Sequence, residues 1–244
     1  YETAQKSVYS PVNVTFSGNG NLYSGVIETA ELTINNSSLN ISTGSSTGGG
    51  YALKTALSSY GNIDITTNLD YGFEMTGDSR IEGTLSMSCS ETGITGNGPL
   101  TIIGEETKLS ITAKNGIDIS NKVTVSNTAT ADIDADNIGI QAHTVSLKAT
   151  VRIKTKIGSA IIIDNFDKKS FSKDSYITLK SSGNALPAVK TKEQSVLILQ
   201  GNFYISGFEH SFYTETQSTY EMQYFTQLQD SDDIIGRIYG FIQA

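Results

Sequence analysis

The chain has 244 residues, of which 37% are hydrophobic, and its 25 acidic and 17 basic side chains give a net charge of −8. This length can bury a sizeable core in one large domain or two modest ones. The acidic balance argues against a general nucleic-acid binder, which would carry a basic face. No apolar run approaches the ~20 residues that a membrane-spanning helix needs. We therefore expect neither a nucleic-acid partner nor a membrane span.

A small residue followed by a large apolar one recurs along the first two-thirds of the chain. Successive large residues are separated by 20, 21, 23, 23 and 21 positions. These anchor residues are Leu53, Phe73, Ile94, Ile117, Ile140 and Ile161. A step of about 21 residues suits one turn of a three-sided β-solenoid, which consists of three short strands and three corners.

Residues 115–136 show the pattern of one turn most clearly, because three segments alternate apolar and polar side chains with period 2. Their apolar positions are Ile117, Ile119, Val123, Val125, Ala131, Ile133 and Ala135. A single turn cannot bury such a face, whereas stacked turns build a continuous core. The sequence predicts an all-β, right-handed β-solenoid over residues 1–175, including an N-terminal cap.

Two rows of charge occupy outward positions of the predicted strands, and equivalent members of the rows lie one turn apart. The rows predict the ion pairs Asp132–Arg152, Asp134–Lys154 and Asp136–Lys156 between stacked turns. Exposed pairs of this kind set strand register more than stability. The alternative is that both rows are simply solvated. The basic residues from Lys148 to Lys173 have two interpretations as well: they face an anionic partner, or the acidic row partly neutralises them.

The pattern and composition of the sequence change near residue 175, where the predicted strands lengthen and aromatic residues become frequent. We expect a small antiparallel, barrel-like β domain over residues 176–226 and a C-terminal docking segment over 227–244. The pattern of the docking segment predicts either a short helix or an apolar strand. The predicted partner-docking residues are Tyr220, Tyr224, Phe225, Ile238, Tyr239 and Phe241.

Two segments resemble components of contractile phage tails. ADIDADNIGIQAHTVSLKATVRIKTKIGSAIIID, residues 131–164, resembles the needle regions of tail spike proteins. Residues 175–226 resemble the small β-barrel of baseplate hub proteins, with Phe203 to Ser211 as one barrel strand that carries His210. The resemblance implies a structural virion protein that works as a homotrimer with other structural subunits as partners.

A competing resemblance covers the first two-thirds of the chain. The units GYALKT, GNIDITT and NGIDIS look like those of secreted bacterial β-helix proteins that bind carbohydrate. This resemblance implies a polysaccharide partner and a location outside the cell or on its surface. Tyr51 and Tyr71 are aromatic candidates for sugar stacking, although their positions in the repeat favour a packing role.

Carboxylates in the column that follows the anchors are candidates for catalysis. The column reads Glu74, Thr95, Asp118, Gln141 and Ile162. Carboxylates two turns apart would lie about 9–10 Å from one another, close to the ~6.5–9.5 Å of inverting glycosidases. A polysaccharide-degrading enzyme is therefore the third interpretation, after the two non-catalytic ones, because any long ladder yields some such pair.

The remaining chemistry points away from cofactors and metals. His143 and His210 lie in different regions, so a two-histidine metal site is not expected, and no phosphate-binding loop motif occurs. The single cysteine, Cys89, shares strand parity with Leu85 and Met87, which predicts an inward, unreactive thiol. We expect no cofactor, no metal and no catalytic residue.

Overall fold

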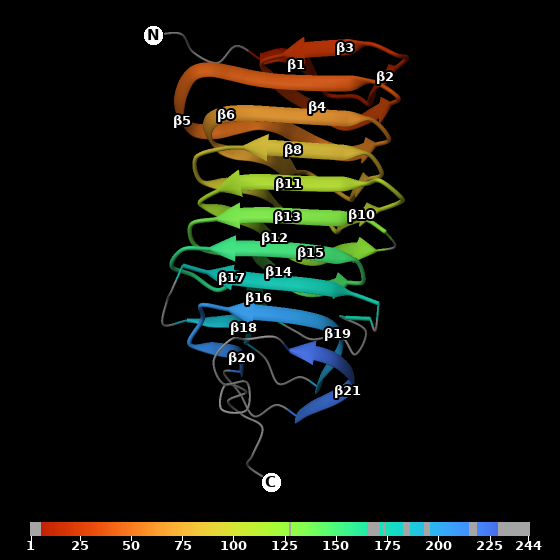
Figure 1. The fold of residues 1–244 in the computed structure, drawn as a ribbon. Coiled ribbons are helices and arrows are strands. Elements are labelled where there is room, and N and C mark those ends of the chain that lie inside the picture. The colour runs from red at the N-terminus through yellow and green to blue at the C-terminus, as the bar shows by residue number, and fades with distance from the viewer. Residues whose placement is uncertain are drawn as a thin grey trace.

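The computed structural model describes residues 6–126, 128–164, 171–172, 174–182, 186–192, 196–214 and 219–228. Over these residues the protein is all-β, with no helix, and forms a parallel β-solenoid of about 8 turns (Figure 1). The strand pairings between turns are parallel, from the N-terminal turn to the last described one. The described part of the chain contains no helix long and apolar enough to cross a membrane.

Three sides alternate around the solenoid, and long strands bend from one side to the next. Side A contains β3 (Asn21–Ser24), the start of β5 (Ser38–Ser59), the start of β6 (Asn62–Met75), β8 (Thr84–Ser88), β11 (Lys108–Ala113), β13 (Thr130–Ala135), β15 (Thr150–Thr155), β17 (Tyr176–Ser181) and the end of β19 (Val196–Ser206).

Side B contains β1 (Lys6–Ser10), the start of β4 (Val26–Asn35), parts of β5 and β6, β9 (Thr92–Gly96), the starts of β12 (Asn115–Ser126) and β14 (Ile140–Leu147), β16 (Ile161–Ile163), β18 (Pro187–Thr191) and β20 (His210–Thr214). Side C contains β2 (Val14–Ser17), the ends of β4 and β5, β7 (Ser79–Ile81), β10 (Leu100–Ile103), the ends of β12 and β14, and the paired starts of β19 and β21 (Thr219–Leu228).

The predicted anchors stack in a single buried column on side B. Each anchor from Leu53 to Ile161 is the direct partner of the next anchor in the adjacent strand. The structure extends the column to Ile27 at one end and to Val189 and Phe212 at the other. All of these side chains are buried. The sequence-derived period is therefore the turn of the solenoid.

The small residue before each anchor lies where adjacent turns approach closely. A Cβ on Gly116 would lie 2.4 Å from the carbonyl oxygen of Gly139 and 2.4 Å from Cγ2 of Ile133. The same crowding recurs at Gly139, where a Cβ would meet Ile153 at 2.2 Å. Real Cβ contacts are longer, so a larger side chain would force the turns apart. The small–large repeat thus follows from packing.

The core runs the length of the solenoid and matches the predicted inward set. The apolar positions predicted for residues 115–136 are all buried. Cys89 is buried as predicted, next to this core.

The C-terminal segment departs from the prediction. An antiparallel, barrel-like domain was expected over 176–226, but the described strands β17 to β21 pair in parallel and continue the solenoid. His210 therefore lies on a solenoid strand, where it is the partner of Pro187. The turn lengthens here, because Ile161 pairs with Val189, a longer step than any between the earlier anchors.

Aromatic packing in the core explains why aromatic residues become frequent after residue 175. Phe203 meets Phe171 with ring centroids 5.1 Å apart and meets Phe212 at 6.0 Å, both edge to face. Large rings replace Ile and Val in two core columns, since Phe212 follows Val189 on side B and Phe203 follows Ile177 on side A. Of the predicted docking residues, Tyr220, Tyr224 and Phe225 lie on β21 with side chains outside the described set, and Ile238, Tyr239 and Phe241 lie outside the described residues.

Candidate functional site

The two predicted charge rows face each other on side A and the corner that follows it. Asp132 pairs with Arg152, and Asp134 with Lys154, in the register of β13 and β15. Arg152 Nη1 donates to Asp132 Oδ1 at 3.0 Å. Lys156 Nζ lies 2.5 Å from Asp136 Oδ1, and this hydrogen bond raises the pKa of Lys156. Two of the three predicted ion pairs therefore form.

The residues of the third predicted pair, Asp134 and Lys154, are strand partners, but their side chains form no ion pair with each other. Asp134 and Lys154 are both exposed, and neither forms an ion pair with a described residue. The acidic row thus partly neutralises the basic residues of this region, in line with one of the two interpretations, while Lys154 is left without an ion-pair partner among the described residues.

The predicted column that follows the anchors on side B forms as expected. Glu74, Thr95, Asp118, Gln141 and Ile162 are successive partners in adjacent strands. Glu74 and Asp118 are two turns apart with Thr95 between them, a separation of about 9–10 Å from strand spacing. Burial raises the pKa of Asp118; the nearby Asp164 adds to the rise, and Lys192 opposes it.

A charged cluster that sequence reasoning missed lies at the corner after side B. Lys192 Nζ lies 2.9 Å from Asp164 Oδ1, and His143 Nδ1 lies 3.9 Å from Asp164 Oδ2. His143 lies on β14, whereas Asp164 and Lys192 directly follow β16 and β18. The step from Asp164 to Lys192 is longer than the step from His143 to Asp164. Because these sequence spacings are unequal, a search with one fixed repeat period misses the cluster. Among the described residues no group of three or more side chains is arranged to hold a metal ion.

Tyr71 lies on the surface, although the repeat favoured a packing role for both Tyr51 and Tyr71. They are direct partners on β5 and β6, where each precedes the small residue of its repeat. Tyr71 is 36% exposed, and Tyr51 is half-buried. The small residue at the corner turns inward in place of the tyrosine, which leaves the ring on the surface.

Polar groups are fixed around the two rings. The Tyr51 hydroxyl donates to Glu28 Oε2 at 2.5 Å. Lys54 Nζ lies 4.8 Å from the Tyr51 ring centroid and 2.8 Å from Glu74 Oε1. The hydrogen bond to Glu74 is the main cause that raises the pKa of Lys54, and burial opposes it. Three consecutive turns thus present two aromatic rings framed by hydrogen-bonding groups; we call these five residues the Tyr51–Tyr71 site.

Cys89 and His210 take no part in this site. Burial raises the pKa of the Cys89 thiol to about 11, so the thiolate is scarce at neutral pH. His210 lies far along the solenoid on β20, where its ring stacks on Tyr213 with centroids 6.5 Å apart.

No protein-family model, curated protein or solved structure matches the chain. The tail-protein and carbohydrate-binding resemblances therefore stay predictions, and a functional proposal has to rest on the geometry of the surface.

Proposed function

We propose that the protein is a non-catalytic binding protein that holds a polysaccharide at the Tyr51–Tyr71 site on side B. The observation that carries the proposal is the pair of tyrosines on adjacent turns, of which Tyr71 is exposed and Tyr51 is half-buried. An aromatic ring packs against the apolar C–H face of a sugar while the polar groups at its edge bond the hydroxyls.

The frame around the rings suits a neutral sugar. Glu28, Glu74 and Lys54 supply acceptors and donors that are already held in place by the ladder and by one another. A ligand therefore meets groups that need little ordering on binding, which lowers the entropic cost.

The column below the rings gives an extended ligand room to continue. Thr95, Asp118 and Gln141 follow Glu74 along the solenoid axis, one residue for each turn. Successive strands are about 4.8 Å apart, so the column offers a polar group at regular steps. This arrangement favours a polymer over a small molecule.

Titration against a panel of neutral and acidic polysaccharides, followed by calorimetry, tests the proposal. We expect Tyr71→Ala to weaken binding about tenfold, because loss of a ring contact and of its buried area removes roughly 1.4 kcal/mol. Tyr60→Ala is the matched control, since Tyr60 is 47% exposed and lies at a different corner. Equal affinities of the two variants would overturn this site.

A structural component of a contractile tail is the second proposal. The observation that favours it is that residues 7–27 carry no charged side chain. β1, β2 and β3 occupy this end of the solenoid (Figure 1), where Tyr9 and Tyr23 are 65% and 75% exposed. A neutral strand edge is a template for docking another strand. Light scattering after size exclusion tests the predicted homotrimer, whose mass would be about 78 kDa, three times 26.1 kDa; a monomer at all concentrations would contradict it.

A polysaccharide-degrading enzyme is the third proposal, supported by the raised pKa of Asp118 two turns from Glu74. A general acid benefits from such a shift. Release of reducing ends from bound polysaccharide, abolished in Asp118→Asn, would support it; binding without release would leave the non-catalytic proposal in place.

A further inference from the structure

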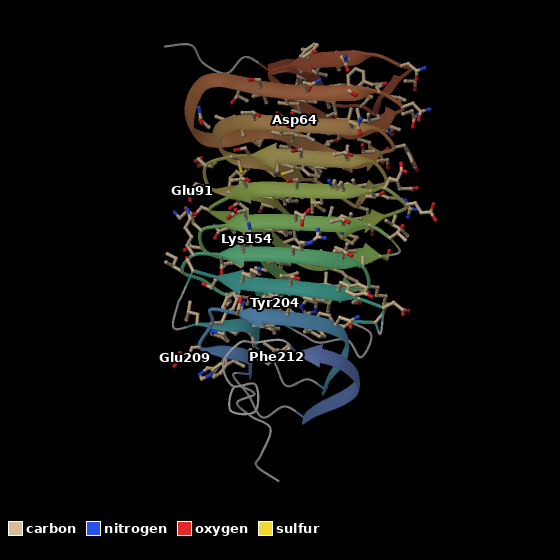
Figure 2. All side chains as sticks on the ribbon, in the orientation of Figure 1. Asp64, Glu91, Lys154, Tyr204, Glu209 and Phe212 are labelled. Carbon is tan, nitrogen blue, oxygen red and sulfur yellow. The ribbon has the colours of Figure 1, made fainter. Side chains whose placement is uncertain are left out.

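We propose that side A carries a second binding site, for an anionic polysaccharide, formed by Lys154, Lys180, Tyr176 and Tyr204. We call these four residues the side A patch. They come from β15, β17 and β19, three strands that are neighbours in the ladder. Figure 2 shows Lys154 and Tyr204 on the same face of the solenoid.

Strand register brings the four side chains together. Lys154 is the direct partner of Lys180, so the two ammonium groups start from strands about 4.8 Å apart. Thr178 is the partner of Tyr204, and Tyr176 is the partner of Asn202. Tyr204 therefore lies diagonally between Lys180 and Tyr176, which are four residues apart on β17, or about 13 Å along the strand.

The charges of the side A patch are not neutralised within the described residues. Arg152 and Lys156 are held by Asp132 and Asp136, whereas Lys154 and Lys180 form no ion pair with a described carboxylate. Two exposed carboxylates lie at its margins, namely Asp134 one turn before Lys154 and Asp174 just before β17. The unpaired cations are therefore concentrated on the β15–β17 side, where an anion would be attracted.

The rings add a surface that a simple ion site lacks. Lys180 Nζ lies 5.0 Å from the Tyr204 ring centroid, and Tyr176 is 59% exposed. A sugar ring can pack against an exposed tyrosine while its carboxylate or sulfate pairs with a lysine.

A shallow groove extends the side A patch toward the preceding turns. It has a volume of about 220 Å³, and its polar lining consists of Ser110, Thr112, Asp132, Asp134, Arg152 and Lys154. Arg152 is paired with Asp132, and the hydroxyls of Ser110 and Thr112 suit the uncharged part of a sugar chain. Lys154 belongs to both the groove and the patch, so one extended chain can contact both.

Polysaccharide is favoured over nucleic acid by the number of unpaired cations. Nucleic-acid binders neutralise many closely spaced phosphates, commonly about 6–10. The side A patch offers two lysines without a described ion-pair partner, on a chain of net charge −8. A polymer with one charge on each sugar or each second sugar needs fewer cations and matches the rings.

Calorimetry with a soluble polyuronate as the probe tests this proposal on the full chain. We expect the double variant Lys154→Gln/Lys180→Gln to bind about tenfold more weakly, from the loss of two charge contacts. Tyr176→Ala should weaken binding about threefold, from loss of ring stacking. The matched control Lys114→Gln/Lys122→Gln changes the net charge equally, outside the patch, and should leave the affinity unchanged within about twofold.

Several outcomes would overturn the proposal. These are absence of polyuronate binding, an equal loss in the control, an unchanged affinity of Tyr176→Ala, and binding of a DNA duplex as tight as that of the polyuronate. Circular dichroism establishes that each variant is folded. Because the Tyr51–Tyr71 site is on side B, Tyr71→Ala should keep its affinity for the polyuronate, so the two proposals fail independently.

Discussion

The middle and the C-terminal end of the solenoid share one parallel strand ladder but differ in the residues that fill their cores. In the middle, Ile94 pairs with Ile117 and Ile140 with Ile161 at nearly equal steps, and the core consists mainly of Ile, Val, Leu and Ala. At the end, the step from Ile161 to Val189 is longer and phenylalanines fill the core. The described strands stay in parallel register across this longer step, because the ladder constrains only the strands. A change in repeat length and core composition along a repeat protein therefore does not by itself indicate a new fold.

The largest expected effect tests the aromatic end. Phe203→Ala removes a buried ring that contacts Phe171 and Phe212, and should destabilise the protein by about 4 kcal/mol. Hydrogen exchange should accelerate in β17 to β20 first, while the strands from β6 to β13 stay protected, because each turn contacts only its neighbours. Uniform acceleration along the chain would contradict this local picture.

A somewhat smaller effect tests the close approach of turns in the middle. In Gly139→Ala the new Cβ would meet the carbonyl oxygen of Ala160 at 2.5 Å. Overpacking of this kind should cost about 2–3 kcal/mol in denaturant unfolding. The control is Gly20→Ala, where nothing lies within 4 Å of the added Cβ. A stable Gly139→Ala would mean that the turns can separate easily.

A pH effect should distinguish Asp118 from the exposed charges. Burial raises its pKa in the folded state above the ordinary 3.8, so the folded protein binds more protons than the unfolded chain in this range. Stability contributed by the protonated form is then lost as pH rises from 3.8 through the folded pKa. Asp118→Asn should remove this loss. Unfolding free energies of both proteins, measured across this pH range, should converge at the acidic end and diverge above it.

The smallest effect is expected at the exposed ion pairs. Arg152→Gln breaks the contact with Asp132, whose side chain is 39% exposed, and should change the unfolding free energy by less than about 1 kcal/mol. The change should shrink further in high salt. A larger cost that persists in salt would show that this pair stabilises the turn rather than only its register.

Several features of the site could be predicted from local patterns. The polar column from Glu74 to Ile162 and the register of Asp132 with Arg152 were both predictable, because equal positions in successive turns become partners. The cluster of His143, Asp164 and Lys192 was not, since the sequence spacings between its members are unequal. The outward direction of Tyr71 was also missed, because period-2 alternation breaks at the small residue of the corner.

Sequence alone determined the β-solenoid, its turn length and the inward anchors such as Ile117, because alternation and small–large pairs are local and repeat with each turn. Only the tertiary structure decided that strands β17 to β21 stack in parallel on the same core, and that Lys154, Lys180 and Tyr204 meet on one side. The reason is that strand partnership after a long corner depends on where the chain returns to the ladder. Core packing and backbone pairing decide where the chain returns to the ladder, and a local sequence period contains no information about that position.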